Sequence, residues 1–550
     1  MWQLLSDAEK CQAARAVWNV RDAHLRHRPA GEEGVLDLII ADLLQDDDIG
    51  GSDPVRAWFL GSVGSIQELL PLAKRAIVEN SKQGRFEQVE FNRLDAEAND
   101  IVLGALFKAW DFRVRSAKLY GLDDSGVSPN GILVQATGLA PPWTSGTDIL
   151  QALSVQYEVS GALLKSLWGP RLASDVARKD VTEKIAEQLA GLAEICCRGF
   201  EERSTWCEQQ IDASEGILQE GITVRERYYA SRGAWIKPLV ELGRLDKAYE
   251  LAERWQDYRT LVELTFEELL RADIIITESD GPGTISKAER DKERSEAMES
   301  KDSTYERLER YFESFGEMFA VEMYEYLVEG QHLQMLLNGF ENWREKYLTP
   351  FLRSNKKYAK LSWIHDVSLG EYALAAETLL EVATEQEDDQ WNKKIELSIG
   401  KLAKIAATGH LDEKEVRAID SELELVEIQN RIFQAVKFVA QSTIDEDAAV
   451  GEGLSMFARA LASKKRAGCR RLWVAAFERA VKGKVMGVEE IADLLTLSDG
   501  GEDSGPLIVE AERGDEFFWA LKALSLGGLE TERRRLAEQS IWRRCFLGDE

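Results

Sequence analysis

The chain has 550 residues, of which 44% are hydrophobic and 30% are charged. It is longer than the size at which a single hydrophobic core stops growing, so we expect several domains or a stack of repeated units. The formal net charge of -29 argues against a protein that binds nucleic acid through its phosphates, because such a binding face is basic.

The residue composition favours helix over strand. Only 11 prolines occur in the chain, and the helix formers alanine, leucine and glutamate are abundant. Apolar residues recur at steps of three and four through most of the sequence, which is typical of amphipathic helices. We therefore predict an all-α fold, an irregular and elongated α-helical stack (a solenoid of helix hairpins) in two or more blocks.

Three parts are predicted in chain order. Residues 1–276 form an N-terminal helical stack, in which Asp53 caps a helix that has Pro54 at its first position. Residues 277–304 are crowded with charge and lack apolar periodicity, so we predict a mobile charged insertion. Residues 305–550 form a C-terminal helical block, which we expect to dock a partner.

One helical run in the N-terminal part is unusually long. Its periodicity continues from Ala173 to about Tyr229, which exceeds the length of an average globular helix. We therefore expect a break near Cys196–Gly199.

A leucine–glycine pair recurs between predicted helices. Leu242-Gly243 and Leu369-Gly370 are each followed by alanine and leucine at similar steps. In both copies the glycine would supply a left-handed C-cap for the preceding helix. Two loose copies indicate a degenerate helical repeat.

The stretch 358–407 has the pattern of an αα-hairpin. Apolar residues after Gly370 fall on one side of a helix, and a second apolar run follows a short acidic connection. Small residues in both runs, including Ala375 and Ala403, would let the two helices approach closely. The second run consists of Ile395, Ile399, Leu402, Ala403 and Ala406. Its lysines are expected to face water: Lys393, Lys394, Lys401 and Lys404.

No sequence motif indicates an enzyme. The chain has neither a phosphate-binding glycine loop nor the zinc and nucleophile motifs of the common hydrolases. His24 and His27 are close enough for a metal site, but neighbouring arginines disfavour it. The six cysteines include no C-x-x-C pair, and we interpret them as reduced thiols of an intracellular chain. We expect no enzymatic activity, no cofactor and no metal.

Two basic runs interrupt the acidic sequence, at residues 464–471 and 533–544. Such runs could contact RNA or acidic lipid, but a solvated helix face or a docking site for an acidic partner is the commoner interpretation. The chain also has 15 tryptophans. Most of them belong to the core, and those at an edge of the stack could anchor a partner.

Several stretches of the sequence carry a family resemblance. They are Leu361–His365, the pattern LG-x4-A-x2-TLL-x2-A that ends at Ala383, the pattern KK-x3-S-x2-KLA-x-IAA that ends at Ala407, Asp53–Pro71, Leu242–Leu264 and Phe319–Leu337. Together they resemble the C-terminal helical domain of the nucleoporin 133 family, scaffold subunits at the stalk end of the Y-shaped nuclear pore subcomplex. The family's N-terminal β-propeller has no counterpart here, so its membrane contact is not carried over to this chain.

The resemblance implies a structural subunit of the nuclear pore complex, in the nuclear envelope of the nucleus, that supports nucleocytoplasmic transport. It implies binding to the C-terminal helical tail of nucleoporin 107 (nucleoporin 84 in some lineages) and to other Y-complex nucleoporins, without direct nucleic-acid or membrane contact. A helical-repeat adaptor of vesicle coats is the alternative. The hairpin is the predicted docking surface, although its residues could instead pack only on the neighbouring helix. The predicted contacts are Trp363, Leu374, Thr378, Leu379 and Val382.

Overall fold

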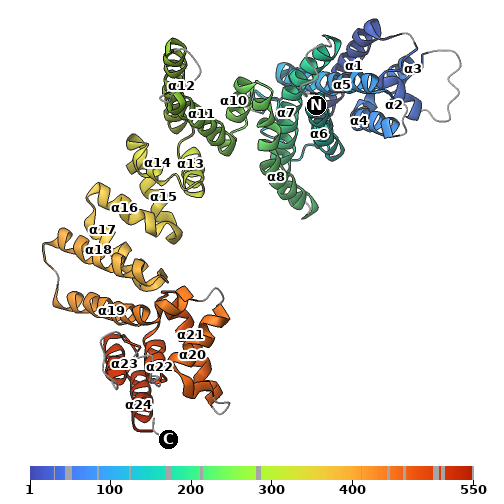
Figure 1. The fold of residues 1–550 in the computed structure, drawn as a ribbon. Coiled ribbons are helices and arrows are strands. Elements are labelled where there is room, and N and C mark those ends of the chain that lie inside the picture. The colour runs from blue at the N-terminus through green and yellow to red at the C-terminus, as the bar shows by residue number, and fades with distance from the viewer. Residues whose placement is uncertain are drawn as a thin grey trace. The chain divides into compact units, whose positions relative to one another are not determined.

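The chain is predominantly helical in the computed structural model, which confirms the predicted all-α fold (Figure 1). The structure describes residues 1–29, 31–43, 53–82, 86–122, 126–167, 176–210, 215–279, 287–410, 412–442, 446–462, 466–498, 507–508 and 515–547. Extended pairing in this described part is limited to isolated bridges, Val127 with Leu133 and Asp389 with Lys484. Packing groups the helices into two compact units, Met1–Tyr326 and Leu327–Glu550. The three-part division predicted from the sequence remains a prediction.

The first unit begins with helices that pack across long sequence separations. Asp53 caps α3 as predicted, because its carboxylate accepts a hydrogen bond from the Val55 amide at 3.0 Å and Pro54 follows it. The helices of this unit are α1 (Trp2–His27), α2 (Val35–Leu43), α3 (Pro54–Gly61), α4 (Ile66–Lys82), α5 (Gln88–Ser116), α6 (Thr147–Leu167), α7 (Val176–Glu208), α8 (Glu215–Ile236), α9 (Pro238–Glu241), α10 (Leu245–Arg254), α11 (Tyr258–Ser279), α12 (Lys287–Phe315) and most of α13 (Glu317–Glu329).

A buried charged cluster joins α1, α5 and α7. The Arg113 guanidinium of α5 donates to both carboxylate oxygens of Glu9 on α1, at 2.7 and 2.9 Å, and also pairs with Glu202 on α7. The indole of Trp143 donates to Glu9 at 3.1 Å, and that of Trp110 donates to Glu202 at 3.2 Å. All three charged side chains are almost completely excluded from solvent. The cluster is stable only as a whole, because a buried charge requires a partner.

The predicted break near Cys196–Gly199 is wrong. Helix α7 runs without interruption from Val176 to Glu208, and Cys196, Cys197 and Phe200 are fully buried in its middle. It packs against α5, α6 and α8. Contacts on several sides stabilise a helix longer than its own sequence would support.

The described part of the predicted charged insertion 277–304 is helical. Helix α11 runs to Ser279 and α12 begins at Lys287, and residues 280–286 lie outside the described residues. Helix α12 packs along α11, burying Ala297 and Thr304, and Lys301 donates to Asp273 at 2.6 Å. The sequence pattern did not predict this helix, because the residues that begin its packed side are an alanine and a threonine and not large apolar residues.

Both predicted glycine caps are confirmed. Gly243 and Gly370 have φ angles of +71° and +80°. The amide after each glycine donates back across the helix end, from Arg244 to the Leu239 carbonyl and from Glu371 to the Asp366 carbonyl, both at 2.9 Å. The glycine amides also donate, to the Val240 and Val367 carbonyls at 3.0 and 3.1 Å. These two bonds at each helix end form the Schellman motif, which requires the left-handed conformation that glycine adopts without strain.

The second unit continues with shorter helices and closes around its own core. Its helices are the end of α13, α14 (Leu333–Asn338), α15 (Thr349–Ser354), α16 (Ala359–Leu369), α17 (Tyr372–Glu381), α18 (Gln390–Thr408), α19 (Glu413–Ser442), α20 (Glu446–Phe457), α21 (Ala467–Val481), α22 (Val488–Thr496), α23 (Asp515–Leu526) and α24 (Thr531–Leu547). A π-helical turn, Val382–Gln386, extends α17.

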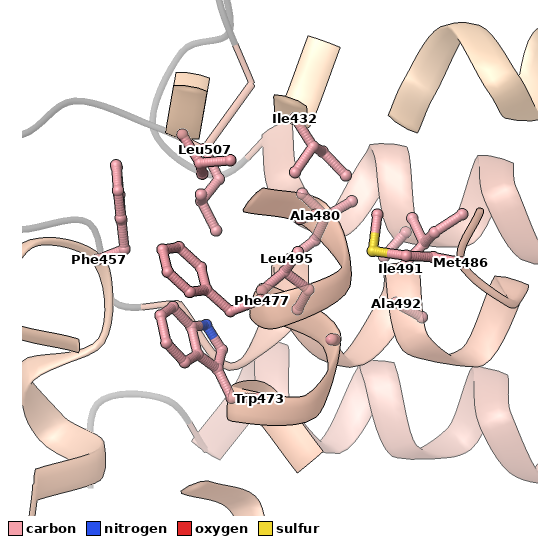
Figure 2. Close-up of a cluster of buried hydrophobic side chains, with 14 of the residues drawn as sticks. Ile432, Phe457, Trp473, Phe477, Ala480, Met486, Ile491, Ala492, Leu495 and Leu507 are labelled. Atoms are coloured by element: carbon pink, nitrogen blue, oxygen red, sulfur yellow. The ribbon is translucent and has the colours of Figure 1, made fainter. Parts of the chain in front are cut away.

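Helices α19 to α24 share one hydrophobic core. Figure 2 shows Phe477 of α21 between Trp473 and residues of other elements, and the Trp473 and Phe477 rings stack with centroids 4.5 Å apart. The Trp473 indole N–H donates to the Ser498 hydroxyl at 2.9 Å. Ile541 brings α24 into the same core. The last described helix is therefore held by packing, and not only by surface contacts.

Candidate partner-docking surface

The predicted αα-hairpin is formed by α17 and α18, with α16 packed on the other side of α17. Asp389 caps α18 by accepting from the amides of Trp391 and Asn392, both at 3.0 Å. The two helices pack tightly at Gly400, where an added Cβ would lie 3.1 Å from the Leu380 side chain. Small residues therefore line the contact between the helices, as the sequence predicts, and Gly400 is one that the sequence analysis did not single out.

The five predicted docking residues do not share one exposed face. Leu374 is exposed, whereas Trp363 and Thr378 are half-buried. Leu379 and Val382 are 0% and 1% exposed, because they face the interior of the hairpin together with Ala375 and Ala376. A partner that docks on the folded hairpin can reach the first three side chains but not the last two.

The exposed apolar surface of the hairpin lies mainly on α18. Its side chains are Trp391, Ile395, Leu402 and Ile405, with exposed fractions of 66%, 40%, 65% and 39%. Their spacing of four, seven and three residues places them on one side of the helix, over about 21 Å at 1.5 Å per residue. We call these four residues the α18 stripe. Apolar side chains in such a row are typical of a helix face that another helix covers.

The buried side of α18 differs from the one that the sequence predicts. Leu397, Gly400 and Ala403 are buried, whereas Ile395, Leu402 and Ala406 of the predicted packed run are exposed. Two apolar sides therefore exist on this helix. One packs on α17, and the α18 stripe faces outward.

The lysines of α18 do not simply face water as predicted, because they pair with acidic residues of α19. Lys393 bonds Glu422 at 2.8 Å, and three further pairs follow along the two helices. The others are Lys394 with Glu427 at 2.8 Å, Lys401 with Asp420 at 2.5 Å and Lys404 with Glu415 at 2.7 Å. This row fixes the rotation of α18, so that the α18 stripe points away from both α17 and α19.

The acidic connection between α17 and α18 is anchored within the second unit. The Val485 amide donates to the Asp388 carbonyl at 2.8 Å, and the Gln390 amide donates to the Gly483 carbonyl at 3.0 Å. Arg479 adds an ion pair to the Asp388 carboxylate at 2.6 Å. The hairpin is consequently held at its turn by the helices that follow it in the chain.

Replacing Glu396 with glutamine is expected to stabilise the hairpin above neutral pH. Burial, reinforced by the nearby Glu387 carboxylate, raises the pKa of Glu396 to about 7. The folded state then holds a proton that the unfolded chain releases near pH 4.5, so stability falls as the pH rises between these values. Glu396→Gln should therefore gain about 1–2 kcal/mol at pH 8 and progressively less towards pH 4.5. Hydrogen exchange of α18 in the full chain, at pH 8 and pH 6, measures this difference.

Glu377→Gln is the matched control for that measurement, because Glu377 lies on the exposed side of α17. The control should leave the exchange of α18 unchanged at both pH values. A Glu396→Gln variant with the same pH dependence as the wild type would contradict the assignment of a proton to this site.

The described residues offer little for catalysis. No cluster of histidine, cysteine or acidic side chains suited to a metal ion occurs among them. Burial raises the pKa of the Cys196 and Cys197 thiols, which keeps them protonated and poorly nucleophilic. A search of the described helices finds none that is long and apolar enough to cross a bilayer.

Comparison with known proteins identifies the family. A family model described as "Non-repetitive/WGA-negative nucleoporin C-terminal" matches residues 3–550. Nucleoporin NUP133 of Chaetomium thermophilum is 30% identical over 570 residues, a match that covers 100% of this chain and 40% of that relative. Nucleoporin nup132 of Schizosaccharomyces pombe is 26% identical, with 100% and 44% covered. Nuclear pore complex protein Nup133 of Danio rerio is 24% identical over 352 residues, with 63% and 25% covered.

The chain thus spans less than half the length of the first two relatives. The family match runs through both compact units, and it includes the hairpin that carries the α18 stripe. These matches confirm the resemblance drawn from the sequence, and they give no support to a vesicle-coat adaptor. The chain belongs to the non-repetitive/WGA-negative nucleoporin C-terminal family.

Proposed function

We propose that the chain is a structural, non-catalytic subunit of the nuclear pore complex scaffold and that its hairpin docks the helical tail of another scaffold subunit. Family membership supports the first part, since the relatives are nucleoporins. The α18 stripe supports the second part, because its four large apolar side chains have no covering element among the described residues.

The proposed partner is the C-terminal helical tail of nucleoporin 107, called nucleoporin 84 in some lineages. A tail helix would lie along the α18 stripe, with Trp391 and Leu402 as its main anchors. An interface of two helix faces is held mostly by a few large apolar or aromatic residues near its centre. Burying four such side chains is the main favourable contribution, at about 25 cal/mol per Å² of apolar surface.

The five residues predicted from the sequence have different roles in this proposal. Leu374, Trp363 and Thr378 lie outside the α18 stripe, on α17 and α16, and would contact the partner only where it extends beyond α18. Leu379 and Val382 would not contact the partner, but they would hold α17 against α18. A charged substitution at Leu379 would therefore disrupt the hairpin itself, and it cannot serve as a test of docking.

Co-purification from cell extract tests the proposed complex. The tagged chain is expected to recover nucleoporin 107 and further Y-complex nucleoporins. The Trp391→Glu/Leu402→Glu variant is expected to lose nucleoporin 107 while remaining folded by circular dichroism. Recovery of vesicle-coat subunits in place of nucleoporins, or undiminished recovery of nucleoporin 107 by the variant, would contradict the proposal.

A further inference from the structure

The last described helix, α24, presents a second unusual surface, which the hairpin does not explain. Five arginines and two glutamates occur in this helix, although the whole chain has a net charge of -29. It contains the second of the two basic runs in the sequence. In the first run, Lys464 and Lys465 lie outside the described residues.

One side of α24 is fixed to the second unit. Ile541 is buried in the hydrophobic core, and Arg544 bonds the Asp493 carboxylate and the Thr496 hydroxyl of α22, both at 2.7 Å. Arg533 pairs with Glu489 at the start of α22. Two of the five arginines are therefore used to hold α24 in place.

The opposite side of α24 combines aromatic and cationic side chains. Trp542 and Phe546 are 48% and 78% exposed, and their rings stack with centroids 5.9 Å apart. Arg535 and Arg543 are exposed, and neither makes an ion pair within the part of the chain that the structure describes. Arg535, Trp542 and Phe546 recur at seven and four residues, so they share one helix face about 16 Å long. We call Arg535, Trp542, Arg543 and Phe546 the α24 face.

We propose that the α24 face is a docking site for an acidic amphipathic helix of a partner protein. Tryptophan and arginine are the residue types that most often dominate protein interfaces. The stacked ring pair offers an apolar ridge for the apolar side of the partner. Arg535 lies in line with the ridge two turns earlier and Arg543 lies beside it, so both can pair with partner carboxylates. Covering the rings removes apolar surface from water, and this provides the affinity.

A lipid membrane fits this surface less well. Electrostatic attachment to anionic lipid uses clusters of about four to eight cations, whereas among the described residues of α24 only Arg535 and Arg543 are exposed and make no ion pair. RNA is disfavoured for the same reason, because its binding draws on several phosphate contacts.

The test uses the full chain and a synthetic probe. The probe is a fluorescein-labelled, 20-residue amphipathic helix with leucines on one side and glutamates on both flanks, and its counterpart replaces every glutamate with lysine. Fluorescence anisotropy is expected to show binding of the glutamate probe that depends on the α24 face, whereas any attraction of the lysine probe to this acidic chain should not depend on Trp542 and Phe546. Trp542→Ala/Phe546→Ala should weaken binding about tenfold or more. Arg535→Glu/Arg543→Glu should lose the glutamate probe and gain the lysine probe.

Arg470→Glu/Arg471→Glu is the matched control, because these exposed arginines belong to the other basic run, on α21. It should bind like the wild type, and circular dichroism should show all variants folded. Binding of the glutamate probe that is unchanged in both α24 variants would overturn the proposal. So would α24-dependent binding to phosphatidylserine vesicles, to single-stranded RNA or to a second copy of the chain in sedimentation, without binding of the glutamate probe.

Discussion

Replacing Arg113 with leucine is expected to destabilise the first unit by about 3–5 kcal/mol, because the change leaves two carboxylates buried without a cation. Glu9 and Glu202 are 0% and 1% exposed, and both depend on Arg113 for charge compensation. The neutral donors Trp143, Trp110 and Thr144 remain, but they cannot replace a full positive charge. Hydrogen exchange of α5 in the full chain measures the effect as faster opening of that helix.

Arg115→Leu is the control on the same helix, since its side chain is 77% exposed and pairs only loosely with Asp111 at 3.8 Å. Equal exchange of α5 in both variants would show that the buried cluster does not stabilise this unit.

Substituting glutamate at both Trp391 and Leu402 is expected to weaken binding of the nucleoporin 107 tail by at least about a hundredfold, or about 2.7 kcal/mol. Both side chains are about two-thirds exposed, so the charges should not disturb the fold of the hairpin. They would, however, be buried against the apolar side of the tail when it docks. Isothermal titration calorimetry of the full chain with the purified tail measures the change.

Leu270→Glu is the matched control for the calorimetric titration. Leu270 is an exposed apolar residue of α11, in the first unit, with an exposed fraction of 49%. The control should bind the tail like the wild type. If the control and the stripe variant lost affinity equally, the effect would reflect added charge on an acidic chain and not a specific surface.

The local structure of the hairpin follows from its sequence because the signals are short-range. Gly370 closes α16 in the predicted left-handed conformation, and Ala375, Ala376 and Leu379 pack inward at the predicted steps. The four-residue spacing of a helix and the special freedom of glycine are properties of neighbouring residues. They need no knowledge of the rest of the fold.

The rotation of α18 could not be predicted in the same way. Both Leu402 and Leu397 belong to plausible apolar sides, and the choice between them depends on Gly400, which lets α17 approach, and on the lysine pairs to α19. One of these pairs, Lys401 with Asp420, joins residues that lie 19 positions apart in the sequence. Periodicity alone ranks the larger side chains as buried, and here that ranking is wrong.

The buried cluster of the first unit is still less accessible to prediction. Arg113 and Glu9 lie 104 positions apart, and Arg113 and Glu202 lie 89 apart. From the sequence alone, Arg113, Glu9 and Glu202 would each be predicted to lie on the surface, because charged residues are mostly exposed. The three charges come together only because α1 and α7 both pack against α5.

Hydroxyl-radical footprinting of the full chain, with and without the nucleoporin 107 tail, tests whether the tail docks on the α18 stripe. Trp391 is 66% exposed on the hairpin and Trp542 is 48% exposed on α24, so each reports on its own surface in one experiment. The tail is expected to protect Trp391, Leu402 and Ile405 from oxidation and to leave Trp542 as reactive as before. A tail that binds while the oxidation of Trp391 stays unchanged would contradict docking on the α18 stripe.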